Sequence, residues 1–313
     1  MTTRTGRLPS KGKQGLRWGV LGAAWIAGKA VIPAIQASRN GRVLVIASRD
    51  PERAQAMASR FSIPRAIASY EAVLEDAAVD AIYIPLVNSL HREWTLRALE
   101  AGKHVLCEKP LGMDAGEAQE MADAARVAGR CLMEAFMYRF HPRARAFVEA
   151  LRTGPRPLHV QASFGFPLTD KSNYRLVREL GGGALLDVGC YAVSAARWIL
   201  GEPDNVLAQA RVDRQSHVDM SVSALLRFAE GGTASVWSSF ESAEEQGLAA
   251  VTSEGTFTLE HPFTAWKDPD DPYQLMVESF ANSVLQAEPV EISSDESVAN
   301  MKVIDRIREA AGI

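Results

Sequence analysis

Short apolar runs alternate with helix-like segments through residues 16–135, and this alternation constrains the fold more than any other feature. The runs are too short for helices and end at turns or at helix starts, as buried strands do. Repeated strand–helix units of this length predict a parallel, doubly wound α/β sheet. The predicted strands are 16–21, 42–47, 81–84, 105–107 and 131–135, and helices are expected to end near 37, 61, 101 and 128, with a short helix from 69.

The second half of the chain has a different pattern. Glycine turns at Glu230-Gly231-Gly232 and Glu254-Gly255 separate β-rich runs and predict hairpins. We therefore expect an α+β domain with a large, open, mostly antiparallel sheet. The predicted division is a flexible arm (1–15), a first domain (16–136), a second domain (137–293) and a last helix (294–313) that packs back toward the first domain. The β-rich runs are 158–166, 206–212, 220–228, 233–240, 247–252 and 255–259, with helices at 142–151, 272–286 and 295–311.

Composition fits a globular protein of a reducing compartment. The 313 residues are 47% hydrophobic and 23% charged, which allows a sizeable core and two domains. The net charge of −4 argues against a protein whose main partner is nucleic acid. Cys107, Cys131 and Cys190 form no C-x-x-C pair, so we expect no disulfide framework, no metal site and a cytoplasmic location. No apolar run is long enough to predict a membrane span.

The turn after the first strand resembles a dinucleotide-binding turn. Gly22 takes the first place of a G-x-G-x-x-G pattern, and Ala24 and Ala27 take the second and third, with Trp25 and Ile26 between them. Small residues allow a tight turn and let backbone N–H groups and a helix N-terminus approach a pyrophosphate. Taken alone, the pattern is equally compatible with a strand–helix turn that binds nothing.

The end of the second predicted strand bears on the choice of cofactor. Ser48 and Arg49 stand where an acidic residue would hold the ribose of NAD. A carboxylate repels the 2′-phosphate of NADP, whereas a hydroxyl and a guanidinium can bind it, so NADP is favoured over NAD. Asp50 is the competing ribose ligand, but the sequence Asp50-Pro51-Glu52 is typical of a helix N-terminus.

Two further strand ends carry polar side chains. Glu108 and Lys109 follow the strand 105–107, and the loop from Leu86 through Asn88 to His91 follows the strand 81–84. Ligands of open α/β sheets bind outside the carboxyl ends of the strands, which favours a chemical role for Lys109. The alternatives are a surface lysine in an ordinary loop and, for His91, a structural hydrogen bond at a helix start.

A glycine-rich segment leads into the one helix that interrupts the second half. Gly181-Gly182-Gly183 precede Asp187 and Tyr191, and a four-residue step places these two side chains on one helical face. That face would present a carboxylate and a phenol together. The alternative is an aspartate favoured by the helix dipole and a tyrosine packed in the core.

These motifs together resemble the Gfo/Idh/MocA oxidoreductase family. The Gly22 turn, Glu108-Lys109-Pro110, Tyr138-Arg139-Phe140-His141-Pro142 and the segment from Gly181 to Tyr191 occur in the family's order. The resemblance covers the chain from Leu16 onward and implies an NAD(P)-binding Rossmann domain followed by an α/β domain whose open sheet often forms the oligomer interface. It therefore implies a homodimer or homotetramer.

One departure from the family pattern narrows the resemblance. Many members have histidine where this chain has Tyr191. With tyrosine at this position, the chain resembles the branch of dimeric dihydrodiol dehydrogenases, NADP-dependent D-xylose dehydrogenases and some deoxysugar ketoreductases. The resemblance thus implies NADP-dependent hydride transfer to or from a sugar, a sugar derivative or a diol. The alternative is a regulatory or scaffold protein that binds NADP without turnover, but the intact set of Lys109, Asp187 and Tyr191 argues against it.

The predicted roles follow from the chemistry of a hydroxyl proton. We expect Tyr191 to act as general base, with the Lys109 ammonium favouring its phenolate, although the two roles can be exchanged. Asp187 would position the substrate hydroxyl. The expected cofactor residues are Gly22, Ala24, Trp25, Ile26, Ser48, Arg49, Leu86, Asn88, His91, Glu108, Lys109, Tyr138 and Arg139, and the expected substrate residues are Phe136, Tyr174, Arg175 and His261.

Overall fold

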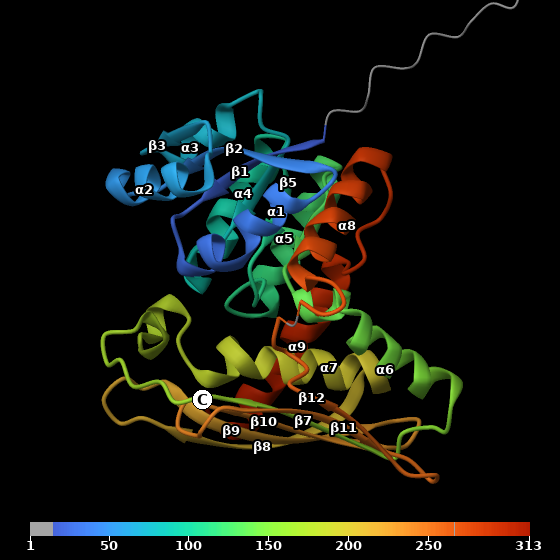
Figure 1. Ribbon diagram of the computed structural model, residues 1–313. Coiled ribbons are helices and arrows are strands. Elements are labelled where there is room, and N and C mark those ends of the chain that lie inside the picture. The colour runs from blue at the N-terminus through green and yellow to red at the C-terminus, as the bar shows by residue number, and fades with distance from the viewer. Residues whose placement is uncertain (1–14, 266) are drawn as a thin grey trace, which may run out of the picture.

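The computed structural model describes residues 15–265 and 267–313, which form two six-stranded sheets with helices around and between them (Figure 1). Apart from Gly15, the predicted arm at 1–15 lies outside the described residues.

The first sheet is entirely parallel, with the strand order β3-β2-β1-β4-β5-β6. This confirms the doubly wound prediction, since the order reverses between β1 and β4. The short strand β3 was not predicted, because its three residues carry no apolar run. The strands are β1 (Leu16–Leu21), β2 (Gly41–Ala47), β3 (Arg65–Ile67), β4 (Ala81–Ile84), β5 (His104–Cys107) and β6 (Leu132–Glu134).

Side-chain caps start several of the helices that connect these strands. Asp50, Ser69 and Asp114 each accept a hydrogen bond from a backbone N–H group of the first turn, and Gly129 ends α5 in the left-handed conformation. The helix after β1 contains a π-helical turn, which the sequence pattern did not predict. The segments are η1 (Ala27–Val31), α1 (Ile32–Ala37), α2 (Pro51–Phe61), α3 (Tyr70–Glu75), η2 (Asn88–Leu90), α4 (His91–Glu100) and α5 (Ala115–Ala128).

The second sheet has the order β12-β11-β7-β10-β9-β8 and is antiparallel except for the pair β7 and β10. Both predicted hairpins are confirmed: β9 pairs with β10, and β11 pairs with β12. Gly231 and Gly232 have φ angles of 90° and 98°, which explains the glycines in the first turn. The strands are β7 (His159–Gly165), β8 (Pro203–Val212), β9 (Asp219–Phe228), β10 (Thr233–Ser239), β11 (Glu245–Val251) and β12 (Thr256–Glu260).

Helices lie on one side of this second sheet, between it and the first sheet (Figure 1). The main one consists of a π-helical turn, η6 (Leu185–Gly189), continued by α7 (Cys190–Leu200). The segment 178–200 is long and apolar enough to cross a membrane, but 83% of its apolar 18-residue stretch is buried, which is typical of a core helix. The remaining elements here are η3 (Met137–Phe140), α6 (Pro142–Thr153), η4 (Tyr174–Leu176) and η5 (Arg178–Leu180).

The last two helices return to the first sheet. In α8 (Pro272–Gln286), Phe280 packs 5.2 Å from Trp18 of β1 between ring centroids, and the main-chain oxygen of Glu278 accepts a hydrogen bond from Asn40. This helix was assigned to the second domain on sequence alone. In α9 (Ser294–Ala311), Asp305 accepts a hydrogen bond from the main chain of Ala115 at the start of α5.

Candidate active site

Predicted site residues follow four adjacent strands of the first sheet. The segments after β2, β1, β4 and β5 carry Ser48, Gly22, Asn88 and Lys109, respectively. Because the strands are parallel, their carboxyl ends meet at one edge of the sheet. The structure therefore brings the predicted cofactor segments and the predicted catalytic lysine to the same edge.

The turn at Gly22 has the backbone that a dinucleotide requires. Gly22 has a φ angle of 115°, and a Cβ atom at this position would lie 2.9 Å from Cδ2 of Leu86. Ala24 and Ile26 are half-buried, while the Trp25 side chain is 74% exposed at the start of the following helix. These residues fit a pyrophosphate bound by the turn and the helix N-terminus.

At the end of β2, Asp50 serves as the helix cap that the sequence predicted. Its Oδ1 accepts hydrogen bonds from the main-chain N–H groups of Glu52 (3.0 Å) and Arg53 (3.2 Å), and Ser48 Oγ accepts one from the Asp50 N–H at 3.2 Å. Arg49 lines a pocket of about 300 Å³ with Tyr70, Trp94 and neighbouring residues. Asp50 is therefore engaged by its own helix, and cofactor binding by Ser48 and Arg49 stays a prediction.

Arg53 is a candidate that the sequence interpretation missed. Its guanidinium Nη2 donates a hydrogen bond to the main-chain oxygen of Ala23 at 2.7 Å, so it joins the first turn of α2 to the Gly22 turn. The signal was present in the sequence, since a basic residue in the first turn after Ser48-Arg49 is well placed for a phosphate.

The loop after β4 is tied to both neighbouring segments. The Asn88 side-chain amide donates a hydrogen bond to the main-chain oxygen of Gly181 at 2.8 Å. In the buried His91 ring, Nδ1 lies 2.8 Å from the Pro110 oxygen and Nε2 lies 3.0 Å from the Leu86 oxygen. Burial lowers the pKa of His91 to about 4, so the ring is neutral at pH 7. These contacts match the structural alternative for His91, and its role toward a cofactor stays a prediction.

Lys109 and Asp187 form the centre of the site. The Lys109 ammonium donates to the Asp187 main-chain oxygen at 2.7 Å and to its Oδ1 at 3.0 Å. The side chains are 14% and 9% exposed, respectively. Burial lowers the pKa of Lys109, but Asp187 and other neighbouring groups together raise it by more, so the pKa lies above its ordinary value. Lys109 therefore carries its proton at neutral pH.

A second cation shares the same carboxylate. Arg175 Nε donates to Asp187 Oδ2 at 2.6 Å, and its guanidinium lies 4.8 Å from the ring centroid of Tyr174. Burial raises the pKa of Asp187, but Lys109 and Arg175 together hold it below its ordinary value. Two cations around one nearly buried carboxylate are costly for a structural role, which favours a role in catalysis or binding. The predicted substrate residues Tyr174 and Arg175 thus lie at the catalytic pair.

The geometry of Tyr191 corrects its predicted activation by Lys109. The Lys109 ammonium lies 5.2 Å from the centroid of the Tyr191 ring, over its face, while the Tyr191 hydroxyl lies 4.0 Å from the sulfur of Met137. Tyr191 is 7% exposed, and chiefly this burial raises its pKa well above the ordinary value. The expectation that Lys109 favours the phenolate is therefore wrong for this structure, and Tyr191 is a neutral phenol.

Two further predicted residues, Phe136 and Tyr138, pack in the core beside Tyr191, and a third, Arg139, is held by an ion pair. Phe136 and Tyr138 are each 1% exposed, and the Tyr138 hydroxyl lies 2.8 Å from Ser194 Oγ. Arg139 donates to Glu296 at 3.0 Å. The predicted contact of Tyr138 and Arg139 with a cofactor, and of Phe136 with a substrate, is not supported, because burial and these bonds leave them little free surface.

Glu108 and His261 occupy contrasting positions. Glu108 is buried and accepts a hydrogen bond from the Tyr83 hydroxyl at 2.7 Å, and burial raises its pKa. His261 is exposed after β12 with a φ angle of 46°. Two residues later, Phe263 packs 5.4 Å from the Tyr191 ring. The buried Phe263, which the sequence also offered for the substrate rim as part of His261-Pro262-Phe263, therefore packs against Tyr191.

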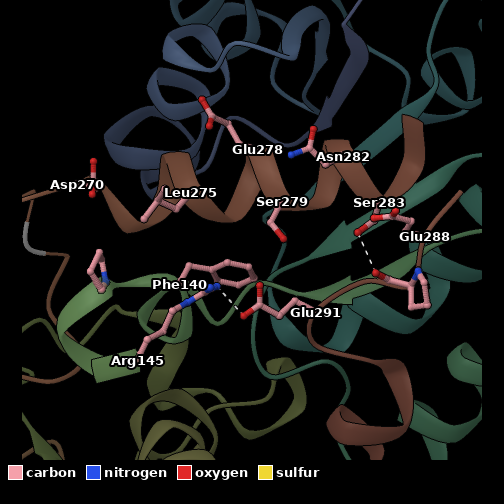
Figure 2. A pocket seen from close by; sticks show the side chains of 12 residues that line it. Phe140, Arg145, Asp270, Leu275, Glu278, Ser279, Asn282, Ser283, Glu288 and Glu291 are labelled. Atoms are coloured by element: carbon pink, nitrogen blue, oxygen red, sulfur yellow. Dashed lines mark hydrogen bonds and ion pairs between the residues drawn. The ribbon is translucent and has the colours of Figure 1, made fainter. Parts of the chain in front are cut away.

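A larger pocket, of about 730 Å³, lies away from these residues along α8 (Figure 2). Glu278, Ser279, Asn282 and Ser283 of α8 line one side of it, and Arg145 lies on the other side. None of the predicted catalytic, cofactor or substrate residues lines this pocket. Size alone therefore does not locate the site, and the charged cluster at Lys109 does.

Comparison with known proteins agrees with this geometry. A family model described as "Oxidoreductase family, NAD-binding Rossmann fold" matches residues 16–136, and the GFO/IDH/MocA C-terminal domain matches residues 141–258. The chain is 41% identical to D-xylose 1-dehydrogenase (NADP(+)) 2 of Haloferax volcanii, over 95% of this chain and 97% of the relative. It is 39% identical to trans-1,2-dihydrobenzene-1,2-diol dehydrogenase of Mus musculus, over 69% of this chain and 66% of the relative.

Solved structures give the same result. The 3-ketoreductase from Actinomadura kijaniata, in complex with NADP and TDP-benzene, superimposes with a TM-score of 0.85 at 32% identity, over 95% of this chain and 98% of the other. The aldose-aldose oxidoreductase from Caulobacter crescentus, complexed with glycerol, has a TM-score of 0.85 at 26% identity, over 96% and 98% of the two chains. With two family domains matched in order and relatives similar over nearly the whole length, the chain belongs to the Gfo/Idh/MocA oxidoreductase family.

Proposed function

We propose that this protein is an NADP-dependent oxidoreductase that transfers hydride between the nicotinamide and a carbon of a sugar, a sugar derivative or a diol. The observation that carries the proposal is the Lys109–Asp187–Arg175 cluster at the strand edge that also bears the Gly22 turn. Similar proteins act on D-xylose and on a dihydrodiol, and one is a 3-ketoreductase solved with NADP. They favour this activity over the alternative of a regulatory protein without turnover.

The cofactor residues of the proposal follow from the first sheet. The Gly22 turn with Ala24, Trp25 and Ile26 would hold the pyrophosphate, and Ser48 and Arg49 would bind the 2′-phosphate of NADP. NADP supplies the hydride acceptor or donor when it is bound. Leu86, Asn88, His91 and Glu108 complete the edge, the last two by holding the adjoining loops in place.

The protonation states suggest how the chain handles the substrate oxygen. Lys109 holds an ammonium proton and Tyr191 a phenolic proton, so either group is ready to donate to the oxygen of a carbonyl that is being reduced. In the oxidative direction, one of these groups would accept the hydroxyl proton after it has released its own proton to solvent. Asp187 fixes the Lys109 ammonium, and Arg175 offers hydrogen-bond donors to substrate oxygens.

A substrate and cofactor panel tests the proposal. The purified protein is assayed at 340 nm with aldoses, polyols and diols and either NADP or NAD, and in reverse with ketosugars and NADPH. We expect turnover of at least one sugar or diol, with a lower KM for NADP than for NAD. Tight NADP binding without turnover of any panel member would instead support a regulatory protein, and equal affinity for the two cofactors would overturn the role of Ser48 and Arg49.

The proposal also includes the arrangement of the chain. We divide it into a Rossmann domain at 16–136, a substrate domain at 137–293 and a closing helix at 294–313, in a cytoplasmic enzyme. The second sheet would join two or four copies, because its outer face exposes Leu207 (63%) and Leu225 (45%). Light scattering should give a dimer or tetramer that Leu225→Glu dissociates. A monomeric wild type would contradict this part.

A further inference from the structure

The carboxylate of Asp219 contacts the start of the helix that carries Asp187 and Tyr191. Asp219 is the first residue of β9 and is 9% exposed. Its Oδ2 accepts a hydrogen bond from the main-chain N–H of Leu185 at 2.7 Å. Leu185 begins the π-helical turn η6, so a strand of the second sheet satisfies an N–H group that a helix normally leaves without a partner.

Local residues do not supply this contact. Neither the helix η6 nor α7 has a side-chain hydrogen bond from its own N-cap position in the described structure. Serine, threonine, asparagine or aspartate at an N-cap position would do so, but Ala184 stands before η6 and Gly189 before α7. The negative charge of Asp219 also meets the positive end of the helix dipole. The distant Asp219 thus takes the place of a local cap.

Gly183 makes room for this arrangement. Gly183 has a φ angle of 115°, and a Cβ atom there would overlap Asp219 Oδ1. Its main-chain oxygen accepts a hydrogen bond from the Asp187 N–H at 3.2 Å, which closes the first turn. The glycine therefore lets Asp219 approach the turn that ends at Asp187.

The same turn holds the catalytic lysine. The Lys109 ammonium bonds both the main-chain oxygen and the carboxylate of Asp187. A shift of the first turn would therefore move both acceptors of Lys109 at once, together with the partner of Arg175. A displacement of about 1 Å at a reacting group is enough to lower a rate strongly.

We propose that Asp219 is a positioning residue that fixes the start of the 185–200 helix and thereby places Asp187 and the Lys109 ammonium for catalysis. This inference rests on the proposed oxidoreductase function. Asp219 contacts neither substrate nor cofactor in this account, and it acts only through the turn from Gly183 to Asp187.

The test compares Asp219→Ala with Asp213→Ala, because alanine removes the acceptor oxygens. Asp213 gives a matched control, because its carboxylate accepts main-chain hydrogen bonds from Gln215 (3.0 Å) and Ser216 (2.8 Å) in the loop before β9, away from the catalytic helix. Asp219→Ala is expected to lower kcat by about tenfold or more, with the Kd of NADP changed less than about twofold. Asp213→Ala is expected to leave both constants within about twofold of wild type.

Hydrogen exchange provides a readout without substrate. In Asp219→Ala the amides of residues 184–188 should exchange at least about tenfold faster than in Asp213→Ala, while the amides of β1 and β4 are unchanged. Equal kcat in the two variants, or loss of NADP binding in Asp219→Ala, would overturn the proposal. If the wild type turns over no substrate, the proposed function fails, and the exchange rates still decide whether Asp219 holds the helix start.

Discussion

The Lys109 ammonium is the group on which the proposed chemistry depends most directly. It is held by two oxygens of Asp187 and lies over the Tyr191 ring. We expect Lys109→Met to lower kcat by about a hundredfold or more, because the substrate oxygen loses its charged partner, with little change in NADP affinity. Tyr191→Phe keeps the ring and removes only the hydroxyl, and a similar loss would identify that hydroxyl as a proton carrier.

Steady-state kinetics with the best substrate of the panel measure both effects. Lys302→Met, on the exposed side of α9, is the control for a lysine-to-methionine change and should behave as wild type. Near-normal turnover in either active-site variant would remove that residue from proton transfer.

Arg49 is the residue that we expect to decide cofactor preference. Its guanidinium lies at the end of β2 and, if it binds the 2′-phosphate, provides a charge-assisted hydrogen bond. We expect Arg49→Ala to raise the KM for NADP by about tenfold or more and to leave the KM for NAD within about twofold. The ratio of the two kcat/KM values is the measurement. An equal rise in the KM for both cofactors would indicate that Arg49 contacts a part of the cofactor that NAD and NADP share.

At the scale of elements, helix α2 begins at an aspartate that has a structural role and lies next to the predicted cofactor residues. Asp50 caps the helix through Glu52 and Arg53. Asp50→Ala should lower the free energy of unfolding by about 1 kcal/mol, because the cap is lost. The KM for NADP should stay within about twofold. Chemical denaturation and cofactor kinetics check both statements, and a large change in KM with unchanged stability would contradict the cap assignment.

Most strands and both hairpins could be predicted from the sequence. The strand–helix alternation and the hairpin glycines predicted both sheets, because apolar period and turn chemistry are local signals. The π-helical turn at Leu185–Gly189 was not predicted. It is held by Asp219 of β9 and by Lys109 after β5, and such contacts leave no mark on the periodicity of the segment itself.

In the candidate site too, the sequence predicted the residues but not the contacts between them. Lys109, Asp187 and Tyr191 were recognisable from their motifs, but the position of Lys109 over the Tyr191 ring, rather than at its hydroxyl, depends on packing. Burial also raises the pKa of Tyr191, whereas a neighbouring ammonium alone would be expected to lower it. Arg175 reaches Asp187 from the short helix η4, whose three residues show no periodic pattern. The sequence therefore showed the chemistry of Arg175 but not its contact.

For the molecule as a whole, the buried Glu134 of β6 links stability to pH. It is 1% exposed, its Oε1 accepts a hydrogen bond from the Leu111 N–H at 2.9 Å, and burial raises its pKa to about 7. The folded state therefore binds this proton more tightly than the unfolded chain, whose glutamates titrate near about 4.3. Its contribution to stability is complete below that value and is lost as the pH rises through about 7.

Glu134→Gln should remove this pH dependence, because the amide stays neutral and its oxygen can still accept the Leu111 hydrogen bond. Between pH 5 and 7 the wild type should lose on the order of 1.4 kcal/mol of unfolding free energy per pH unit relative to the variant. Denaturant unfolding at pH 5, 6, 7 and 8 measures the difference, with Glu100→Gln on the exposed side of α4 as control. Parallel curves for wild type and Glu134→Gln would show that Glu134 is ionised in the folded protein throughout this range. Folding would then not be coupled to protonation of Glu134.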